Sequence, residues 1–320
     1  MTDRATLEAV LGPIAAGRAT VRFEAGRASI VLDVTGLATD AQAEMEADAK
    51  AAAAALPGVD EVRVLLTSER KVRRMIAVAS GKGGVGKSTI AVNLAIALAR
   101  MGRRVGMVDA DIYGPSQTKL LGVEGIRPKH KDEKLIPVET RFGVPLLSMG
   151  GLVAEGQAIA WRGPMAGSAL GQLVDAEWGD KDLLVLDLPP GTGDVQLTMV
   201  QKHKPVGAVI VSTPQDLALI DARRAIDLFQ RMGVPVIGLI ENMAGYACPH
   251  CGEVSDPFGR GGAETAAAAL GLPFLGRVPL EMAIRAASDA GEPPAAGNGP
   301  GAELFAELAA KVDGWLKTGG

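Results

Sequence analysis

Two different patterns of apolar and polar residues divide the chain. Over residues 1–68, short segments in which apolar and polar residues alternate are separated by stretches with helical spacing. Alternation with a period of two is typical of a strand with one covered face, whereas apolar residues three or four positions apart indicate a helix. Strands are expected at 20–23, 28–34 and 61–66, and helices at 5–11 and 40–55. This part of the chain therefore predicts a small α+β domain.

From residue 75 onward, apolar segments of strand length alternate with helical segments, as in a sheet covered by helices on both faces. Strands are expected at 75–80, 104–109, 145–149, 183–188, 206–212, 234–240 and 274–278. The last helix is expected at 302–317, after a loop rich in glycine, proline and alanine. The fold class predicted for 75–320 is α/β, with a doubly wound, mostly parallel sheet. The charged segment 69–74 is the predicted linker.

Composition and charge exclude some classes of function. The chain is 48% hydrophobic but only 3% aromatic, so its core must consist largely of Ala, Val, Leu and Ile. A net charge of −4 argues against a broad surface for nucleic acid or for an anionic membrane. No apolar run approaches the roughly 20 residues of a membrane helix, and no secretory signal is recognised. We expect a cytoplasmic protein with no membrane or nucleic-acid partner.

A glycine-rich loop follows the first strand of the second domain. The sequence from Gly81 to Ser88 is GKGGVGKS, which fits the pattern GxxxxGK[ST] between a strand and a helix. In such a loop, backbone N–H groups and the helix N-terminus bind phosphate oxygens. Lys87 would bind the β- and γ-phosphates, and Ser88 would be a Mg²⁺ ligand. The expected nucleotide-binding residues are Gly81, Lys82, Gly83, Gly84, Val85, Gly86, Lys87, Ser88 and Thr89.

The two cysteines of the chain, Cys248 and Cys251, stand in the sequence CPHC. Structural zinc sites and 4Fe-4S clusters take four ligands, so this pair supplies half of a site. The same loop from a second copy of the chain would complete it on a two-fold axis. A cluster bridging a homodimer is the favoured reading, and a bridging zinc ion or a redox-active CxxC pair are the alternatives.

The phosphate loop resembles that of the MinD, ParA and nitrogenase-iron-protein class, which has an additional early lysine. The resemblance implies that Lys82 reaches the nucleotide of the partner subunit in a dimer and acts as an arginine finger does. Aspartates at the ends of two later apolar strands also match this class. By the same resemblance, Asp111 orients the attacking water, Asp109 supports the metal site, and Asp187 holds Mg²⁺ through water.

Taken in order, the motifs resemble the Mrp/ApbC family of iron-sulfur cluster carrier ATPases. They are SGKGGVGKST, VDADIYGPS, WRGPM, LDLPPGTGD, ENMAGYACPHC, FGRGG and LPFLGRVPLE, and they cover residues 75–290. The resemblance implies a homodimer that binds ATP and Mg²⁺, hydrolyses ATP slowly, and holds a labile 4Fe-4S cluster between Cys248 and Cys251 of both subunits. Apo iron-sulfur proteins and assembly scaffolds would be its partners. Asn242 would contact adenine. The N-terminal domain lacks a cysteine that its relatives often have. A direct role as a cluster ligand is therefore not expected for it, and partner binding or regulation are the expected roles.

Two rivals belong to other classes. A spatial-organising ATPase of the MinD or ParA kind, with a zinc ion bridging the dimer, is the main alternative. Its membrane-binding version would need a basic amphipathic C-terminus, but the last helix contains Glu303, Glu307 and Asp313. An electron-transfer protein like the nitrogenase iron protein has its ligand cysteines far apart in the chain.

Overall fold

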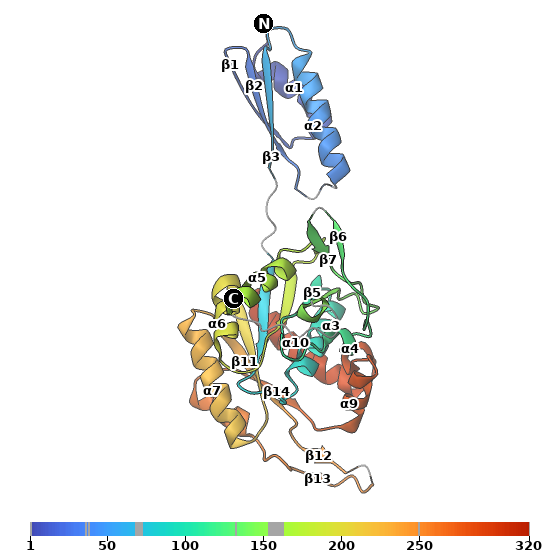
Figure 1. Cartoon of the computed structure of the whole chain (residues 1–320), viewed down its shortest axis with the longest axis vertical. Helices are drawn as coiled ribbons and strands as arrows, with labels where there is room; N and C mark the ends of the chain where they lie inside the picture. Colours follow the sequence, from blue (N-terminus) through green and yellow to red (C-terminus); the bar gives the residue numbers. More distant parts are fainter. Residues whose placement is uncertain are drawn as a thin grey trace. The chain divides into compact units, whose positions relative to one another are not determined.

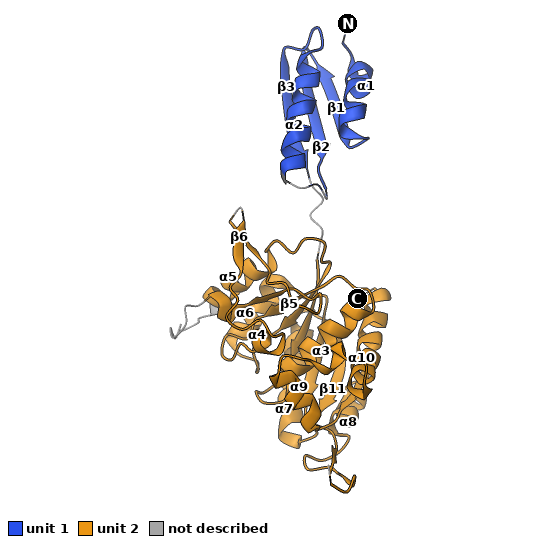
Figure 2. Cartoon of the chain, turned by 90° about the vertical axis from the view of Figure 1, so that its right-hand side faces the viewer, with its two compact units in different colours: residues 1–72 blue, residues 73–320 orange. Residues whose placement is uncertain are grey.

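The computed structural model describes residues 2–35, 37, 39–67, 73–131, 133–152, 163–248 and 250–319. These residues form two compact units, Met1–Val72 and Arg73–Gly320 (Figure 2). The predicted linker falls largely outside the described residues, since 68–72 are not among them. Trp161 and Arg162 of the WRGPM motif lie outside them as well. Each unit has a hydrophobic core of its own.

The N-terminal unit packs two helices on one face of a sheet, which the described residues build from three strands in the order β1-β2-β3. The elements are α1 (Arg4–Ala15), β1 (Ala19–Glu24), β2 (Arg27–Asp33), α2 (Thr39–Ala54) and β3 (Glu61–Thr67). The first helix is longer than the predicted 5–11, because Leu7, Leu11 and Ala15 continue one buried stripe past Pro13. Asp3 caps its N-terminus by accepting a hydrogen bond from the Thr6 amide at 2.8 Å.

The second unit contains the predicted doubly wound parallel sheet. Among the described residues seven strands pair in the order β14-β11-β10-β4-β9-β5-β8, every pair parallel. The strands are β4 (Arg74–Ala79), β5 (Val105–Asp109), β8 (Leu146–Ser148), β9 (Leu183–Asp187), β10 (Gly207–Ser212), β11 (Val236–Asn242) and β14 (Phe274–Val278). All seven strands expected from the apolar runs are present.

Helices cover both faces of this sheet (Figure 1). Packed into one core are α3 (Lys87–Arg100), α4 (Gln117–Leu120), α9 (Met282–Asp289), the 3₁₀ turn Pro294–Ala296 and α10 (Pro300–Lys317). Packed into the core of the other face are the 3₁₀ turn Met149–Leu152 and the helices α5 (Gly163–Val174), α6 (Asp194–His203), α7 (Asp216–Arg231) and α8 (Gly262–Ala269). The last helix buries Phe305, Leu308 and Val312, so it is docked on the domain as its spacing predicts.

Two short antiparallel hairpins were not predicted. The first pairs β6 (Lys129–Lys131) with β7 (Lys134–Ile136), and its side chains, His130 among them, are largely exposed. The second pairs β12 (Tyr246–Ala247) with β13 (Val254–Ser255) and projects from the body of the unit (Figure 1). In the described part of the chain, no helix has the length and apolar character needed to cross a membrane.

Candidate nucleotide site and cysteine hairpin

The phosphate loop joins β4 to α3 and is shaped by glycines at two crowded points. At Gly81, a Cβ atom would lie 2.0 Å from the backbone carbonyl carbon of Asp221 in α7. At Gly86, φ is +79° and a Cβ atom would lie 2.2 Å from the side-chain nitrogen of Asn242. Neither position accepts a larger residue without movement of the backbone or of a buried side chain. The tight turn sets the first residue of α3 at Lys87.

The Lys87 ammonium lies at the centre of a buried charged cluster. It donates a hydrogen bond to the carboxylate of Asp187, lies 3.6 Å from Asp111 Oδ2 and is 3.3 Å from Ser88 Oγ. Lys87 is 5% exposed, Asp111 7% and Asp187 0%. The structure therefore brings together the residues for which the sequence predicted phosphate, water and metal roles.

Asp109 lies next to this cluster and bonds to the residues around it. Its Oδ1 accepts a hydrogen bond from the Asp111 amide at 3.2 Å, and its Oδ2 accepts from Ser148 Oγ at 3.0 Å. It is the direct neighbour of Asp187 across the parallel pair β5 and β9. Burial first, and then the charge of Asp187, raise the pKa of Asp109 to about 7. The cluster is thus short of positive charge when its carboxylates are ionised.

Asp111 makes the turn contacts that an aspartate after a strand commonly makes. Its Oδ1 accepts hydrogen bonds from the amides of Tyr113 at 3.1 Å and Gly114 at 3.2 Å. Its other oxygen faces Lys87. One oxygen of Asp111 therefore stabilises the local turn, and the other belongs to the charged cluster.

Gln117 belongs to the site, and our reading of the sequence missed it. Its side-chain amide donates to Asp187 Oδ2 at 2.7 Å and to the Ser88 carbonyl at 3.0 Å, while its backbone amide donates to Asp109 Oδ2 at 3.1 Å. Gln117 is 0% exposed, and its Oε1 has no hydrogen-bond partner within the described residues. Its place six residues after Asp111, at the start of α4, is the only signal the sequence offers, and that signal is weak.

These residues fit Mg²⁺. Hard oxygen ligands and uncompensated carboxylate charge favour a divalent cation, and the unpartnered Oε1 of Gln117 offers a further oxygen at the cluster. Ser88 and Asp187 are the residues that would hold the ion, and Asp109 and Gln117 would orient them. Magnesium in such sites keeps several waters and phosphate oxygens as ligands, so few protein oxygens are needed.

The remaining predicted nucleotide residues surround the loop. Gly83 and Gly84 are exposed, Val85 is buried, and Thr89 lies in the first turn of α3. The segment after β9 lies against the loop, since the Gly191 amide donates to the Ser80 carbonyl at 2.9 Å. Asn242 is 7% exposed and donates to the Val85 carbonyl at 2.8 Å, so one edge of its amide is already bound to the phosphate loop.

Lys82 is directed toward the start of α7. Its ammonium lies 3.4 Å from Gln215 Oε1, and its own carbonyl accepts a hydrogen bond from Ser80 Oγ at 2.9 Å. The carboxamide of Gln215 is neutral and leaves the charge of Lys82 uncompensated there. Leu217 and Ile220, close by on α7, are 72% and 49% exposed.

The cysteine pair lies on the projecting hairpin formed by β12 and β13. The Cys248 amide donates to the Glu253 carbonyl at 2.9 Å and the Gly252 amide to the Cys248 carbonyl at 2.8 Å, which closes the turn that carries both thiols. Backbone amides of Cys251 and His250, and then the Cys251 thiol, lower the pKa of the Cys248 thiol. The thiolate is the form that binds metals. Within the described residues, no group of three or more His, Cys, Asp or Glu side chains is arranged to hold a metal ion.

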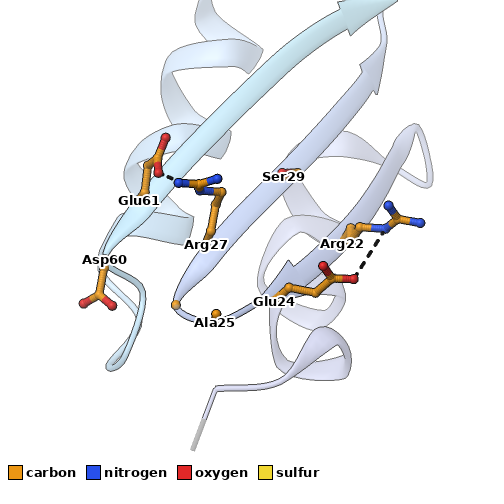
Figure 3. Close-up of a pocket in the computed structure, with 8 residues that line it drawn as sticks. Arg22, Glu24, Ala25, Arg27, Ser29, Asp60 and Glu61 are labelled. Atoms are coloured by element: carbon orange, nitrogen blue, oxygen red, sulfur yellow. Dashed lines mark hydrogen bonds and ion pairs between the residues drawn. The ribbon is translucent and has the colours of Figure 1, made fainter.

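A hollow of about 460 Å³ in the N-terminal unit has different chemistry (Figure 3). It is lined by charged side chains from all three strands of that sheet, and these include two ion pairs: Arg27 with Glu61 at 2.6 Å and Arg22 with Glu24 at 4.0 Å. Each of these four side chains is more than half exposed, so the pairs are largely solvated and contribute little to stability. The candidate site for nucleotide and metal therefore lies in the second unit.

Comparison with known proteins gives a consistent picture. The family model described as ParA, NUBPL iron-transfer P-loop NTPase, matches residues 71–313. An iron-sulfur cluster carrier protein of Pseudomonas fragi is 51% identical over 243 residues, which are 74% of this chain and 84% of the relative. A protein of the same description from Deinococcus radiodurans is 46% identical over 279 residues, which are 83% of this chain and 78% of the relative.

Solved structures extend the similarity to the fold. A nucleotide-binding protein from Archaeoglobus fulgidus, in complex with ADP, superposes with a TM-score of 0.62 at 40% identity, covering 69% of this chain and 88% of that one. The septum site-determining protein MinD from Pyrococcus horikoshii, complexed with Mg-ADP, gives a TM-score of 0.58 at 24% identity, covering 77% and 98%. The likeness to MinD concerns the fold alone.

Proposed function

Because the chain belongs to the ParA family of NUBPL iron-transfer P-loop NTPases, we propose that it is an ATP-hydrolysing carrier of iron-sulfur clusters. In this proposal a 4Fe-4S cluster is the cargo. Cys248 and Cys251 of two subunits bind it, and the dimer passes it to apo-proteins. ATP and Mg²⁺ bind at the phosphate loop of each subunit.

The observation that carries the proposal is the cysteine hairpin. Cys251 is exposed, Cys248 is partly exposed, and both lie in one turn. The pKa of the Cys248 thiol is lowered, which favours the thiolate, the form that binds metals. Two thiols at a projecting turn, with no further His, Cys, Asp or Glu completing a site among the described residues, supply half of a tetrahedral ligand set. A second copy of the chain related by a two-fold axis supplies the other half.

The nucleotide chemistry follows from the charged cluster around Lys87. The Lys87 ammonium is bound to Asp187, and phosphate oxygens would compete for it. Bound Mg²⁺ would supply charge neutralisation at the β- and γ-phosphates. Asp111 keeps one oxygen bound to backbone amides, which fixes the direction of the other, and this second oxygen, which faces Lys87, is suited to orient an attacking water.

Lys82 connects hydrolysis to the dimer. Within its own subunit its ammonium contacts a neutral carboxamide at the beginning of α7 and takes no part in the cluster around Lys87. A lysine held at the rim of the site in this way is suited to approach a phosphate of the facing subunit. Both the thiolate site and the hydrolytic site would then be completed by the same homodimer.

Anaerobic reconstitution tests the proposal. The protein is incubated with iron, sulfide and a thiol reductant, and the iron content, the absorption spectrum and the molar mass in solution are measured on the same sample. We expect about four irons per dimer, a broad absorption typical of 4Fe-4S clusters, and transfer of the cluster to an apo-ferredoxin. Cys248→Ala is expected to remove the cluster while ATPase activity persists.

Two results would oppose the carrier function. A monomer that keeps its full load of iron would contradict a cluster shared between subunits. Zinc in the purified protein, together with failure to take up iron and sulfide, would favour the structural dimer bridge of a spatial-organising ATPase.

A further inference from the structure

The two ends of the cysteine hairpin are joined by one buried carboxylate. The chain leaves β11 at Asn242, forms the hairpin, and re-enters the body of the unit at Gly261, just before α8. Glu241, the residue before Asn242, accepts a hydrogen bond from the Gly261 amide at 3.2 Å and another from the Ala263 amide at 2.8 Å. Its side chain thus holds the returning segment against the departing one.

Glu241 is 0% exposed, and the neighbouring Arg277 compensates its charge. Arg277 of β14 donates from Nε to Glu241 Oε1 at 3.0 Å and also pairs with Glu264 in the first turn of α8. The two amides belong to the N-terminal end of α8, where the helix dipole favours a negative charge. A buried carboxylate with these partners is fixed in place, since losing an amide would cost it a hydrogen bond and losing Arg277 would leave its charge unpaired in the interior.

The adjacent residue contacts the nucleotide loop. Asn242 donates to the Val85 carbonyl at 2.8 Å, and Met243, which follows it, has a φ of +59°. The end of β11 therefore bonds to the phosphate loop through Asn242 and to the base of the cysteine hairpin through Glu241. The end of β14 completes the base, because the Ala244 amide donates to the Val278 carbonyl at 3.0 Å and the Leu280 amide to the Gly245 carbonyl at 2.9 Å.

We infer that Glu241 is a positioning residue that couples the phosphate loop to the cysteine hairpin. A shift of the Val85 carbonyl on nucleotide binding pulls on Asn242, and the neighbouring Glu241 carries this displacement to Gly261 and Ala263. The arrangement of the hairpin, and with it the hold of the thiolates on the cluster, then depends on the nucleotide. The inference rests on the proposed carrier function and identifies the contact through which that function is controlled.

The test compares the nucleotide dependence of cluster transfer in three proteins. Wild type, Glu241→Gln and Glu264→Gln are reconstituted anaerobically as full chains, and transfer to an apo-ferredoxin is timed with ATP and with ADP. Glu264→Gln is the matched control, because it removes the exposed partner of Arg277 and leaves Glu241 in place. We expect the two nucleotides to change the wild-type and control rates by about fivefold or more relative to each other. In Glu241→Gln we expect a ratio near one, with an ATP affinity close to that of wild type.

The readout separates coupling from general damage, because a merely destabilised hairpin would slow or speed transfer equally with both nucleotides. Arg277→Lys is the second variant if Glu241→Gln does not fold. It keeps the positive charge but loses the geometry of the Nε contact, and a reduced ratio is expected. The inference is overturned if the folded variant shows the same ratio of transfer rates with ATP and ADP as wild type. It is also overturned if the wild-type rate is the same with both nucleotides. A wild-type protein that takes up no cluster opposes the carrier function itself.

Discussion

Lys87 and Asp187, 100 residues apart in the chain, form a buried ion pair in which both side chains are almost fully shielded from water. The lysine expected to bind phosphate is thus held by the carboxylate expected to bind the metal. Nucleotide and Mg²⁺ would have to separate this pair by offering each member a new partner. The pair therefore fixes the positions of both side chains at the site.

Replacing Asp187 with Asn should affect both hydrolysis and stability. Loss of the carboxylate is expected to lower the ATPase rate by about a hundredfold or more. It leaves the Lys87 ammonium without its closest partner but with Asp111 still at 3.6 Å, so the free energy of unfolding should fall by about 1–3 kcal/mol when no nucleotide is added. Denaturant unfolding measures the second effect. Asp182→Asn breaks a half-exposed pair with Arg104 and is the control, with an expected change below about 1 kcal/mol. Equal losses in the two variants would contradict the role given to the buried pair.

Gln117 should set the affinity for Mg²⁺. In Gln117→Leu, Asp187 and the Ser88 carbonyl lose a donor that orients them, so the Mg²⁺ concentration giving half-maximal ATPase activity should rise by about tenfold or more. Gln172→Leu changes an exposed glutamine on α5 and should leave the Mg²⁺ titration unaltered. An unchanged titration in Gln117→Leu would remove this residue from the metal site.

The raised pKa of Asp109 predicts a pH dependence of stability. A carboxyl group whose pKa is about 7 in the folded protein and 3.8 in the unfolded chain binds its proton more tightly when folded. Its stabilising contribution is complete below pH 3.8 and is lost as the pH rises toward and through 7, on the order of a few kcal/mol. Between pH 5 and 8, the free energy of unfolding of the nucleotide-free protein should therefore fall more steeply in wild type than in Asp109→Asn. Parallel profiles for the two proteins would show that Asp109 titrates normally.

Mixing two inactive variants tests whether Lys82 acts across the dimer. Lys82→Ala and Lys87→Ala are each expected to be inactive alone. In a heterodimer, the subunit with Lys82→Ala retains Lys87 and receives Lys82 from its partner, so one of its two sites is complete. Random exchange makes half of the dimers mixed, and the ATPase rate should recover to about a quarter of wild type. A mixture of Lys87→Ala with Lys87→Gln cannot complement and is the control. No recovery above this control would place Lys82 in its own site.

Several parts of the molecule were predictable because their signals are local. The seven strands of the parallel sheet are mainly apolar, with Arg277 in β14 as an interior exception, and each was expected within one or two residues of its position. The helix α10 buries the stripe that its spacing predicts. The hairpin of β6 and β7 was missed because its residues, apart from Leu135 and Ile136, are charged or polar and largely exposed, so they have no apolar period. The full length of α1 was missed because a proline within a helical pattern ordinarily marks its end.

The sequence by itself determined the glycine loop, the strand and helix pattern and the separation of the two cysteines, since each depends on residues that are neighbours in the chain. Only the tertiary structure decided which charges meet. It inserts β9 between β4 and β5, which brings Asp187 beside both Lys87 and Asp109, and it folds Gly261 back onto Glu241. These contacts depend on strand order and burial, which are set by the packing of the whole domain. Short-range spacing contains no record of them.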